Sequence, residues 1–242
     1  MHIPVLADEI VSFCATKNEL LIVDATFGCG GHFKALCAAN NNVKIQYFGI
    51  DRDKEILDKF NFEFSKDIKL NLIHSNHDKL QEIYLANKLD NKVDYCIFDL
   101  GVNSEQLDDI DRGFSFRAAA KLDMSMDRNA AKTAFDVVNS YTEEQLADIF
   151  FFYGEERYSR RIARQIIETR KKKKIESTIE LADIIARVYA RSGNKKKNNY
   201  KKNVKNIHPA TRVFQALRIE VNDELKYLAQ TLNFAANSLA KS

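Results

Sequence analysis

Residues 20–32 read LLIVDATFGCGGH, and this stretch decides the expected fold. Four apolar residues form a run of strand length that ends at Asp24, and a glycine-rich turn follows at residues 28–31. Residues 33–39 are then typical of a helix. A buried strand that leads through a glycine turn into a helix is how an α/β nucleotide site begins. Glycines there accept positive φ and let backbone N–H groups come close to a ligand.

The acid at the end of this strand narrows the class of ligand. A carboxylate disfavours a pyrophosphate but can hold a cationic ammonium group, which favours S-adenosylmethionine over a dinucleotide. The dinucleotide pattern G-x-G-x-x-G would start at Gly28, but its last position is Phe33. Residues 45–51 form a second apolar run that ends at Asp51, an acid suited to a ribose with both hydroxyls free. Asp24 and Asp51 together therefore fit an adenosyl ligand with an amino-acid tail.

Structural alternatives stay open for three of these residues. Asp24 could cap the following turn, Asp51 could be a solvated loop acid, and His32 could cap the following helix.

Strand-like and helix-like segments alternate along the first hundred residues. Strands are predicted at residues 20–24, 45–51, 70–74 and 93–99. Residues 2–14 are predicted to form an entry segment followed by a short helix, and further helices are predicted within 33–39, 53–64 and 75–89. This alternation indicates a parallel sheet with right-handed crossovers. Ligands gather at the carboxyl ends of such strands, so Asp24, Asp51 and Asp99 are expected along one edge.

The character of the sequence changes after residue 102. Residues 103–127 are polar and irregular, 141–174 and 177–189 are predicted helices, 191–205 form a loop rich in lysine and asparagine, and 208–241 form one or two helices. Thr142 is the expected N-cap of the first of these helices, and Ser177 or Thr178 that of the second. We therefore expect an α/β domain made of residues 1–103 and 206–242, interrupted by a helical insertion at 104–205.

Composition excludes several classes of protein. The 242 residues carry a net charge of +3, but 37 basic and 34 acidic residues nearly cancel. The four cysteines form no C-x-x-C pair, which indicates a reduced, cytoplasmic protein without a metal site. No apolar run approaches the roughly 18 residues of a membrane span, and the first residues lack the pattern of a signal peptide.

Eight idiosyncratic motifs identify a resemblance that covers almost the whole chain. They are HIPVL at residues 2–6, DATFGCGGH at 24–32, DRD at 51–53, DLGVNSEQLDD at 99–109, RGFSF at 112–116, LDMSMD at 122–127, YGEERYSRRIARQI at 153–166 and HPATRVFQALRIEVNDEL at 208–225. With these motifs the chain resembles the RsmH (MraW) family of ribosomal RNA cytosine-N4 methyltransferases. The resemblance implies a Rossmann-like class I S-adenosylmethionine methyltransferase sheet with strand order 3-2-1-4 and an inserted helical domain.

The implied activity is S-adenosylmethionine-dependent methylation of one cytosine amine in 16S ribosomal RNA, near the decoding centre and within the small subunit. Beside Asp24, the cofactor positions of the family fall on Gly30, Gly31, His32, Asp51, His77, Asp99 and Gln106. At His77 relatives usually carry an aromatic residue, and an imidazole could still stack on adenine. Asp99 is the first candidate for the catalytic acceptor on the cytosine amine, although it could instead bind the cofactor, with the carbonyls of Leu100 or Gly101 as alternatives.

The inserted domain is the expected RNA-recognition domain. The candidate RNA-contacting residues are Arg157, Arg160, Arg161, Lys171, Lys172, Lys195, Lys196 and Tyr200. Basic side chains would contact phosphates and Tyr200 could stack on a base, whereas the structural alternative is a solvated, salt-bridged surface.

The chain stops at Ser242, where relatives continue into a fifth strand, so we expect the C-terminal strands to be missing and strand 4 to be an unpaired edge. The alternative function is therefore a truncated relative that binds RNA or cofactor with weak or no catalysis.

Overall fold

A computed structural model describes residues 4–14, 17–39, 43–90, 92–191 and 208–240, and the chain divides into two compact units. The first unit contains Met1–Asn103 with Glu224–Ser242, and the second contains Ser104–Asp223. Among the described residues, no helix combines the length and the apolar character that crossing a membrane requires.

Four parallel strands form the sheet of the first unit. They are β1 (Glu19–Asp24), β2 (Lys44–Asp51), β3 (Ile68–His74) and β4 (Tyr95–Ile97). Their order is β3-β2-β1-β4, which confirms the predicted order and direction. Asp24 lies level with Gly49 on β2 and with Ile97 on β4. Asp51 and Asp99 therefore each lie two residues beyond the level of Asp24 along the chain.

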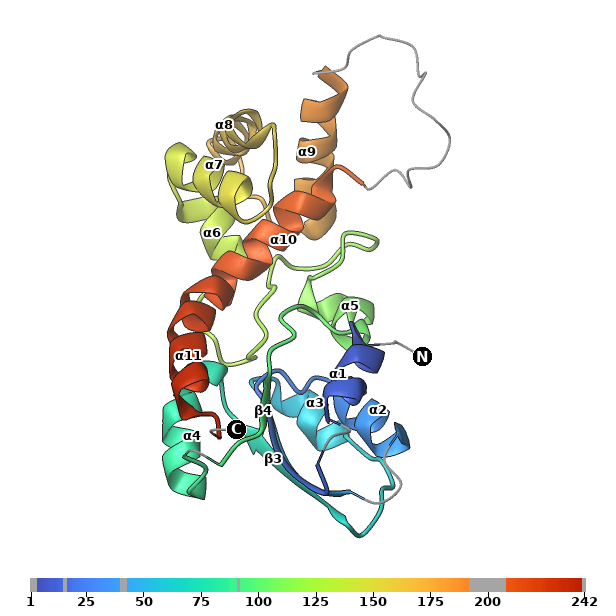
Figure 1. The fold of residues 1–242 in the computed structure, drawn as a ribbon. Coiled ribbons are helices and arrows are strands. Elements are labelled where there is room, and N and C mark those ends of the chain that lie inside the picture. The colour runs from blue at the N-terminus through green and yellow to red at the C-terminus, as the bar shows by residue number, and fades with distance from the viewer. Residues whose placement is uncertain (1–3, 15–16, 40–42, 91, 192–207, 241–242) are drawn as a thin grey trace, which may run out of the picture. The chain divides into compact units, whose positions relative to one another are not determined.

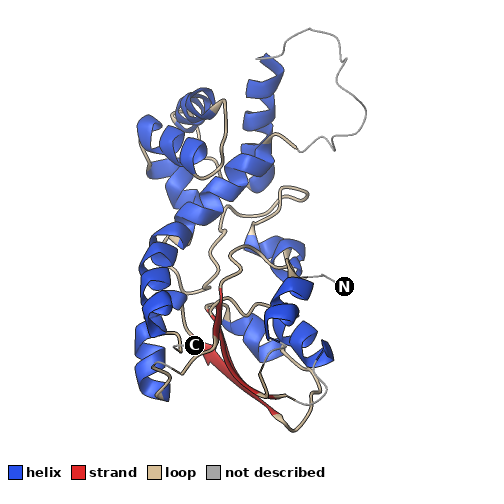
Figure 2. Cartoon of the chain, viewed as in Figure 1, coloured by secondary structure: helices blue, strands red, loops and turns tan. Residues whose placement is uncertain are grey.

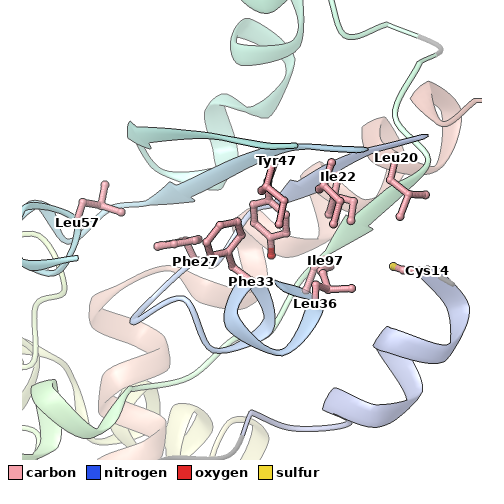
Figure 3. Packing of buried hydrophobic residues seen from close by; sticks show 11 residues of the cluster. Cys14, Leu20, Ile22, Phe27, Phe33, Leu36, Tyr47, Leu57 and Ile97 are labelled. Carbon is pink, nitrogen blue, oxygen red and sulfur yellow. The ribbon is translucent and has the colours of Figure 1, made fainter. Parts of the chain in front are cut away.

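Helices cover both faces of this sheet (Figure 1). They are α1 (Ala7–Cys14), α2 (Gly31–Ala39) and α3 (Lys54–Lys59) on one face, and α4 (Leu80–Asn87) and α11 (Glu224–Ser238) on the other. Side chains alternate between the two faces: Ile22 packs with the first group of helices and Val23 with the second. Figure 3 shows Phe27, Phe33 and Tyr47 together in the core of the first face, with Cys14 of α1 beside it.

The predicted helix at residues 53–64 is wrong beyond Lys59, where α3 ends. Residues 61–65 form no helix, because the sequence FNFEF places an aromatic ring at every second position, which suits an extended segment. The rings of Phe60, Phe62 and Phe64 all contact Phe33, with centroids 6.0, 6.3 and 5.2 Å from it. Packing of these rings against Phe33 therefore favours an extended segment, although the spacing of the apolar residues would also fit a helix.

The second unit consists of helices and loops (Figure 2). The helices are α5 (Ser104–Asp108), α6 (Ala134–Ser140), α7 (Glu143–Phe152), α8 (Ser159–Arg170), α9 (Thr178–Arg191) and α10 (Ala210–Val221). Thr142 caps α7 in a reciprocal capping box with Gln145, as predicted. Ser177 is the cap of α9, because its hydroxyl accepts the Glu180 N–H at 3.2 Å.

The predicted continuous helix at residues 141–174 is interrupted between α7 and α8. Glu155 has φ +50°, and a Cβ on Gly154 would lie 2.4 Å from the Arg212 carbonyl oxygen. The backbone of α10 therefore approaches the turn so closely that only glycine fits. Helix α6, capped by Thr133, was not predicted.

The second boundary between the units lies at 223/224 and not at the expected 205/206. Helix α10 belongs to the second unit because it packs against α6, α7 and α9. Its apolar face, which includes Val213, Phe214 and Leu217, is buried.

The outer edge of β4 was expected to be unpaired. Leu239 forms an isolated parallel bridge with Val93, and the Ala240 N–H donates to the Val93 carbonyl at 2.9 Å. Val93, two residues before β4, is thus bridged to the segment after α11.

Candidate functional site

Three acids lie at the carboxyl edge of the sheet, as the alternating pattern predicts. Asp24 and Asp51 are the last residues of β1 and β2. Asp99 follows β4, and its N–H donates to the Thr26 hydroxyl at 2.7 Å. Thr26 therefore ties the segment after β4 to the turn after β1, which brings the exposed Asp99 to this edge.

Asp24 is enclosed within the protein, with an exposed fraction of 0%. One carboxylate oxygen accepts the Thr26 N–H at 3.0 Å, and the other accepts the Tyr47 hydroxyl at 2.8 Å. Burial raises the pKa of this carboxyl to about 6, against the opposing effect of these two hydrogen bonds. The geometry matches the turn-capping alternative, in which Asp24 holds the turn and does not face a ligand.

Asp51 is half-buried and is oriented by two backbone donors. Its Oδ2 accepts the Gly28 N–H at 2.7 Å and its Oδ1 accepts the Asp53 N–H at 2.9 Å. Burial raises its pKa, while the two N–H groups lower it. A carboxylate has about four acceptor positions, so an oriented Asp51 can still accept hydrogen bonds from ligand hydroxyls.

The glycine turn presents backbone donors at the same edge. Gly28 and Gly30 have φ of +51° and +70°. The Gly30 N–H bonds to the Phe27 carbonyl, and the Lys34 N–H is the first to bond back into α2, to Gly30, both at 2.9 Å. The N–H groups of residues 31–33 precede that bond and are the donors with which a helix N-terminus binds an anion.

His32 and Gly31 both contact the N-terminal strap, which we define as residues 4–6. The His32 side chain is 5% exposed, and its Nε2 lies 3.0 Å from the Val5 carbonyl oxygen. A Cβ on Gly31 would lie 3.1 Å from Pro4 Cβ. The imidazole of His32 is thus directed at the strap, and only its backbone is available to the edge of the sheet.

His77 follows β3 and is 3% exposed. Its Nε2 lies 3.4 Å from the Arg52 guanidinium and its Nδ1 lies 3.4 Å from the Thr231 hydroxyl. Arginine only donates, so Nε2 accepts and Nδ1 carries the proton. The rings of Phe98 and Tyr227 stand edge-on to the imidazole at 6.3 and 6.2 Å. This enclosure leaves little ring area for the expected stacking on adenine.

The titration of His77 predicts a pH dependence of stability. Burial, followed by the charge of Arg52, lowers the His77 pKa from 6.5 to about 4. The folded protein therefore favours neutral His77, which stabilises it above pH 6.5 and is lost as the pH falls towards 4. Asp24 acts in the opposite sense: its pKa is raised from 3.8 to about 6, so its contribution is lost as the pH rises between these values.

The variant His77→Gln should reveal how much the titration of His77 contributes to the pH dependence of stability. The difference in unfolding free energy between the native protein and the variant should be largest above pH 6.5 and should shrink towards pH 4. Urea unfolding at several pH values measures this difference. A difference that does not change with pH would contradict a neutral, buried His77.

The remaining candidates belong to the second unit. Gln106 lies on α5 and is 4% exposed. Five RNA candidates are exposed: Arg157, Arg160, Arg161, Lys171 and Lys172. The Arg157 guanidinium lies 4.7 Å from the centroid of the Tyr158 ring, and Lys171 pairs with Glu168 at 2.9 Å. Lys195, Lys196 and Tyr200 lie outside the described residues.

Sequence reasoning missed four residues that hold the edge together. Thr26 and Tyr47 bind Asp24, and Arg52 and Thr231 bind His77. Thr26 lies inside the DATFGCGGH motif and could have been found there, because a hydroxyl two residues after an acid often bonds to it. No spacing links Thr231 to His77, since 154 residues separate them.

The parallel sheet, the glycine turn that opens α2 and the acids after β1, β2 and β4 define a protein of the Rossmann-like methyltransferase class. The MraW methylase family model matches residues 1–242, and the chain belongs to this family.

Three similar relatives each bear the name ribosomal RNA small subunit methyltransferase H. The protein from Caldicellulosiruptor bescii is 44% identical over 226 residues, which cover 93% of this chain and 69% of the relative. The protein from Trichodesmium erythraeum is 44% identical over 239 residues, covering 98% of this chain and 77% of the relative. The protein from a Sulfurihydrogenibium species is 40% identical over 243 residues, covering 100% and 78%.

Proposed function

We propose that this protein transfers a methyl group from S-adenosylmethionine to the exocyclic amine of a cytosine in 16S ribosomal RNA, near the decoding centre and within the small subunit. The observation that carries the proposal is the oriented Asp51 carboxylate at the same carboxyl edge of the sheet as the exposed Asp99 and the turn that opens α2. The names of the relatives support the RNA substrate.

The chemistry of the edge fits S-adenosylmethionine. Asp51 can accept from two ribose hydroxyls, and the N–H groups at the start of α2 suit a carboxylate. Asp99 offers an exposed negative charge to an ammonium or sulfonium. Asp24 supports Asp99 indirectly, because Thr26 bonds to both residues. The backbones of Gly30, Gly31 and His32 are proposed to contact the cofactor. His77 and, from the resemblance of the motifs, Gln106 are kept as proposed cofactor residues.

Asp99 is our candidate for the catalytic acceptor. When bound, S-adenosylmethionine supplies an already activated methyl group, so the protein mainly contributes positioning. The cytosine amine is a poor nucleophile because its lone pair is delocalised into the ring. A carboxylate that accepts a hydrogen bond from this amine makes the lone pair more available, and it can take the proton that the nitrogen loses. The target base must be unstacked or single-stranded to reach such a group.

The exposed basic residues of the second unit are proposed to contact RNA phosphates. Reversing Arg160 and Arg161 to glutamate should weaken binding to small-subunit RNA and reduce the slope of log affinity against log salt, by roughly 0.7 to 0.9 for each phosphate that the protein no longer neutralises. Fluorescence anisotropy across a salt series measures this slope. The variant Lys54→Glu is the matched control, because Lys54 is an exposed lysine of the first unit that pairs with Asp58. Binding that is insensitive to salt would contradict the proposed RNA surface.

Tritium transfer from labelled S-adenosylmethionine to undermethylated small ribosomal subunits tests the proposed reaction. Methyl incorporation at a cytosine amine, identified by nucleoside analysis, is the expected result. Binding of the cofactor by calorimetry without transfer would instead support the alternative of a non-catalytic relative. A methyl group found on another base or on protein would overturn the proposed substrate.

A further inference from the structure

The N-terminal strap, residues 4–6, is fixed at both of its ends. At one end Pro4 lies against Gly31, and the Val5 carbonyl accepts a hydrogen bond from His32 Nε2 at 3.0 Å. A carbonyl can only accept, so Nε2 carries the proton. At the other end the Leu6 carbonyl accepts a hydrogen bond from the Ile10 N–H at 3.0 Å. This bond lies at the start of α1. The strap is thus held on the first turn of α2 by one buried side chain and leads directly into a helix.

Helix α1 is itself tied to β4, the last strand in the order of the sheet. The Tyr95 hydroxyl, on the first residue of β4, donates to the Phe13 carbonyl at 2.6 Å. Cys14 at the end of α1 is 3% exposed in the core, and α1 packs along α2. The contact between His32 and Val5 adds a further anchor, just before the N-terminal end of α1.

The strap has two features that packing alone does not explain. Leu6 has φ +53°, a left-handed conformation that is unfavourable for leucine. Val5 and Leu6 are 60% and 62% exposed although both are apolar. A strained backbone that is held in place by its surroundings is characteristic of functional segments. Here the strained segment lies against the turn that opens α2.

We propose that His32 is a positioning residue, which acts through its hydrogen bond to Val5. This bond locks the strap onto the first turn of α2, and the locked strap fixes the backbone N–H groups that hold the methyl donor. The inference rests on the proposed function, since it concerns the same site. It assigns His32 an indirect role through its side chain, and it gives Gly31 the role of leaving room for Pro4.

Two variants of His32 separate the hydrogen bond from the shape of the ring. His32→Phe keeps a planar ring but has no N–H to donate, whereas His32→Gln retains a donor at a similar reach. We expect His32→Phe to raise the dissociation constant for S-adenosylmethionine up to about tenfold, the upper end of the effect of one lost hydrogen bond. His32→Gln should recover most of this affinity. Isothermal calorimetry on the full chain measures both.

Hydrogen exchange provides the readout of the strap itself. The Ile10 amide bonds to Leu6, so its exchange should accelerate in His32→Phe and return towards the native rate in His32→Gln. Gly31→Ala is a second route to the same effect, because the new Cβ displaces Pro4 while His32 is unchanged. It should accelerate Ile10 exchange and weaken donor binding together.

Three possible results would contradict the proposal or the function on which it rests. Faster Ile10 exchange with unchanged donor affinity in His32→Phe would overturn the link between strap and site. Equal losses in His32→Phe and His32→Gln would also overturn it, because the imidazole itself would then be required. If the native protein binds no S-adenosylmethionine at all, the proposed function fails, while the exchange rates of the variants still show whether His32 locks the strap.

Discussion

Replacing Asp99 by alanine is expected to lower methyl incorporation into small ribosomal subunits by roughly 10²- to 10⁴-fold, the range that one general base contributes. The physical reason is that the cytosine amine loses both an acceptor that makes its lone pair available and a group that removes its proton. Asp99 is exposed, and the contact that fixes its position is made by its backbone N–H to Thr26. Removing the carboxylate should therefore leave the fold intact, and tritium transfer measures the effect.

Asp99→Asn distinguishes the two roles that the sequence leaves open for this residue. Asparagine keeps an acceptor oxygen but takes up no proton, so transfer should fall while the dissociation constant for S-adenosylmethionine stays close to the native value if the role is catalytic. If Asp99 binds the donor, the dissociation constant should rise in both variants, because a positive ligand loses its counter-charge. Near-normal transfer by Asp99→Ala would refute both roles and leave the carbonyls of Leu100 and Gly101 as candidates.

The strands of the sheet could be predicted because each one is indicated by a few consecutive residues. Each predicted strand is a short, mostly apolar run that ends in an acid or histidine, and a parallel sheet buries such runs on both faces. The predicted edge with Asp24, Asp51 and Asp99 follows from direction alone, since parallel strands end on the same side. Where helical and extended spacings compete, as at residues 60–64, the outcome depends on a partner distant in sequence, here Phe33.

The motifs predict candidate residues for the site, but they do not predict the contacts that these residues make. The motif DATFGCGGH is compatible both with an Asp24 that faces a ligand and with an Asp24 that is buried. Tyr47 decides between them, because its hydroxyl needs an acceptor inside the core and Asp24 provides it. In the same way, His32 and Gly31 belong to a cofactor motif, yet their side of the turn is occupied by Pro4 and Val5. Contacts between distant segments are not encoded in the spacing within one motif.

Replacing Gly30 by alanine should destabilise the protein by roughly 2–5 kcal/mol, the sum of overpacking and of a left-handed backbone for a residue with a Cβ. Gly30 has φ +70°, and a Cβ there would lie 2.5 Å from Phe60 Cε2 and 2.9 Å from Phe27 Cζ. Neither ring can withdraw freely. Phe27 also packs edge-on against Tyr47, with centroids 6.3 Å apart, and Phe60 against Phe27 at 5.0 Å. Urea unfolding, with the slope checked against the native protein, measures the loss.

Gly101→Ala is the matched control, because a Cβ on Gly101 meets no heavy atom of the described chain within 4 Å. Its stability should stay within about 1 kcal/mol of the native value, since the same change is made where space is available. Equal losses in both variants would mean that the cost does not come from the clash with the aromatic core, because Gly101 makes no such contact. If Gly30→Ala were as stable as the native protein, Phe60 would have to move aside at little cost. Packing against the aromatic core would then not be the reason for a glycine at this position.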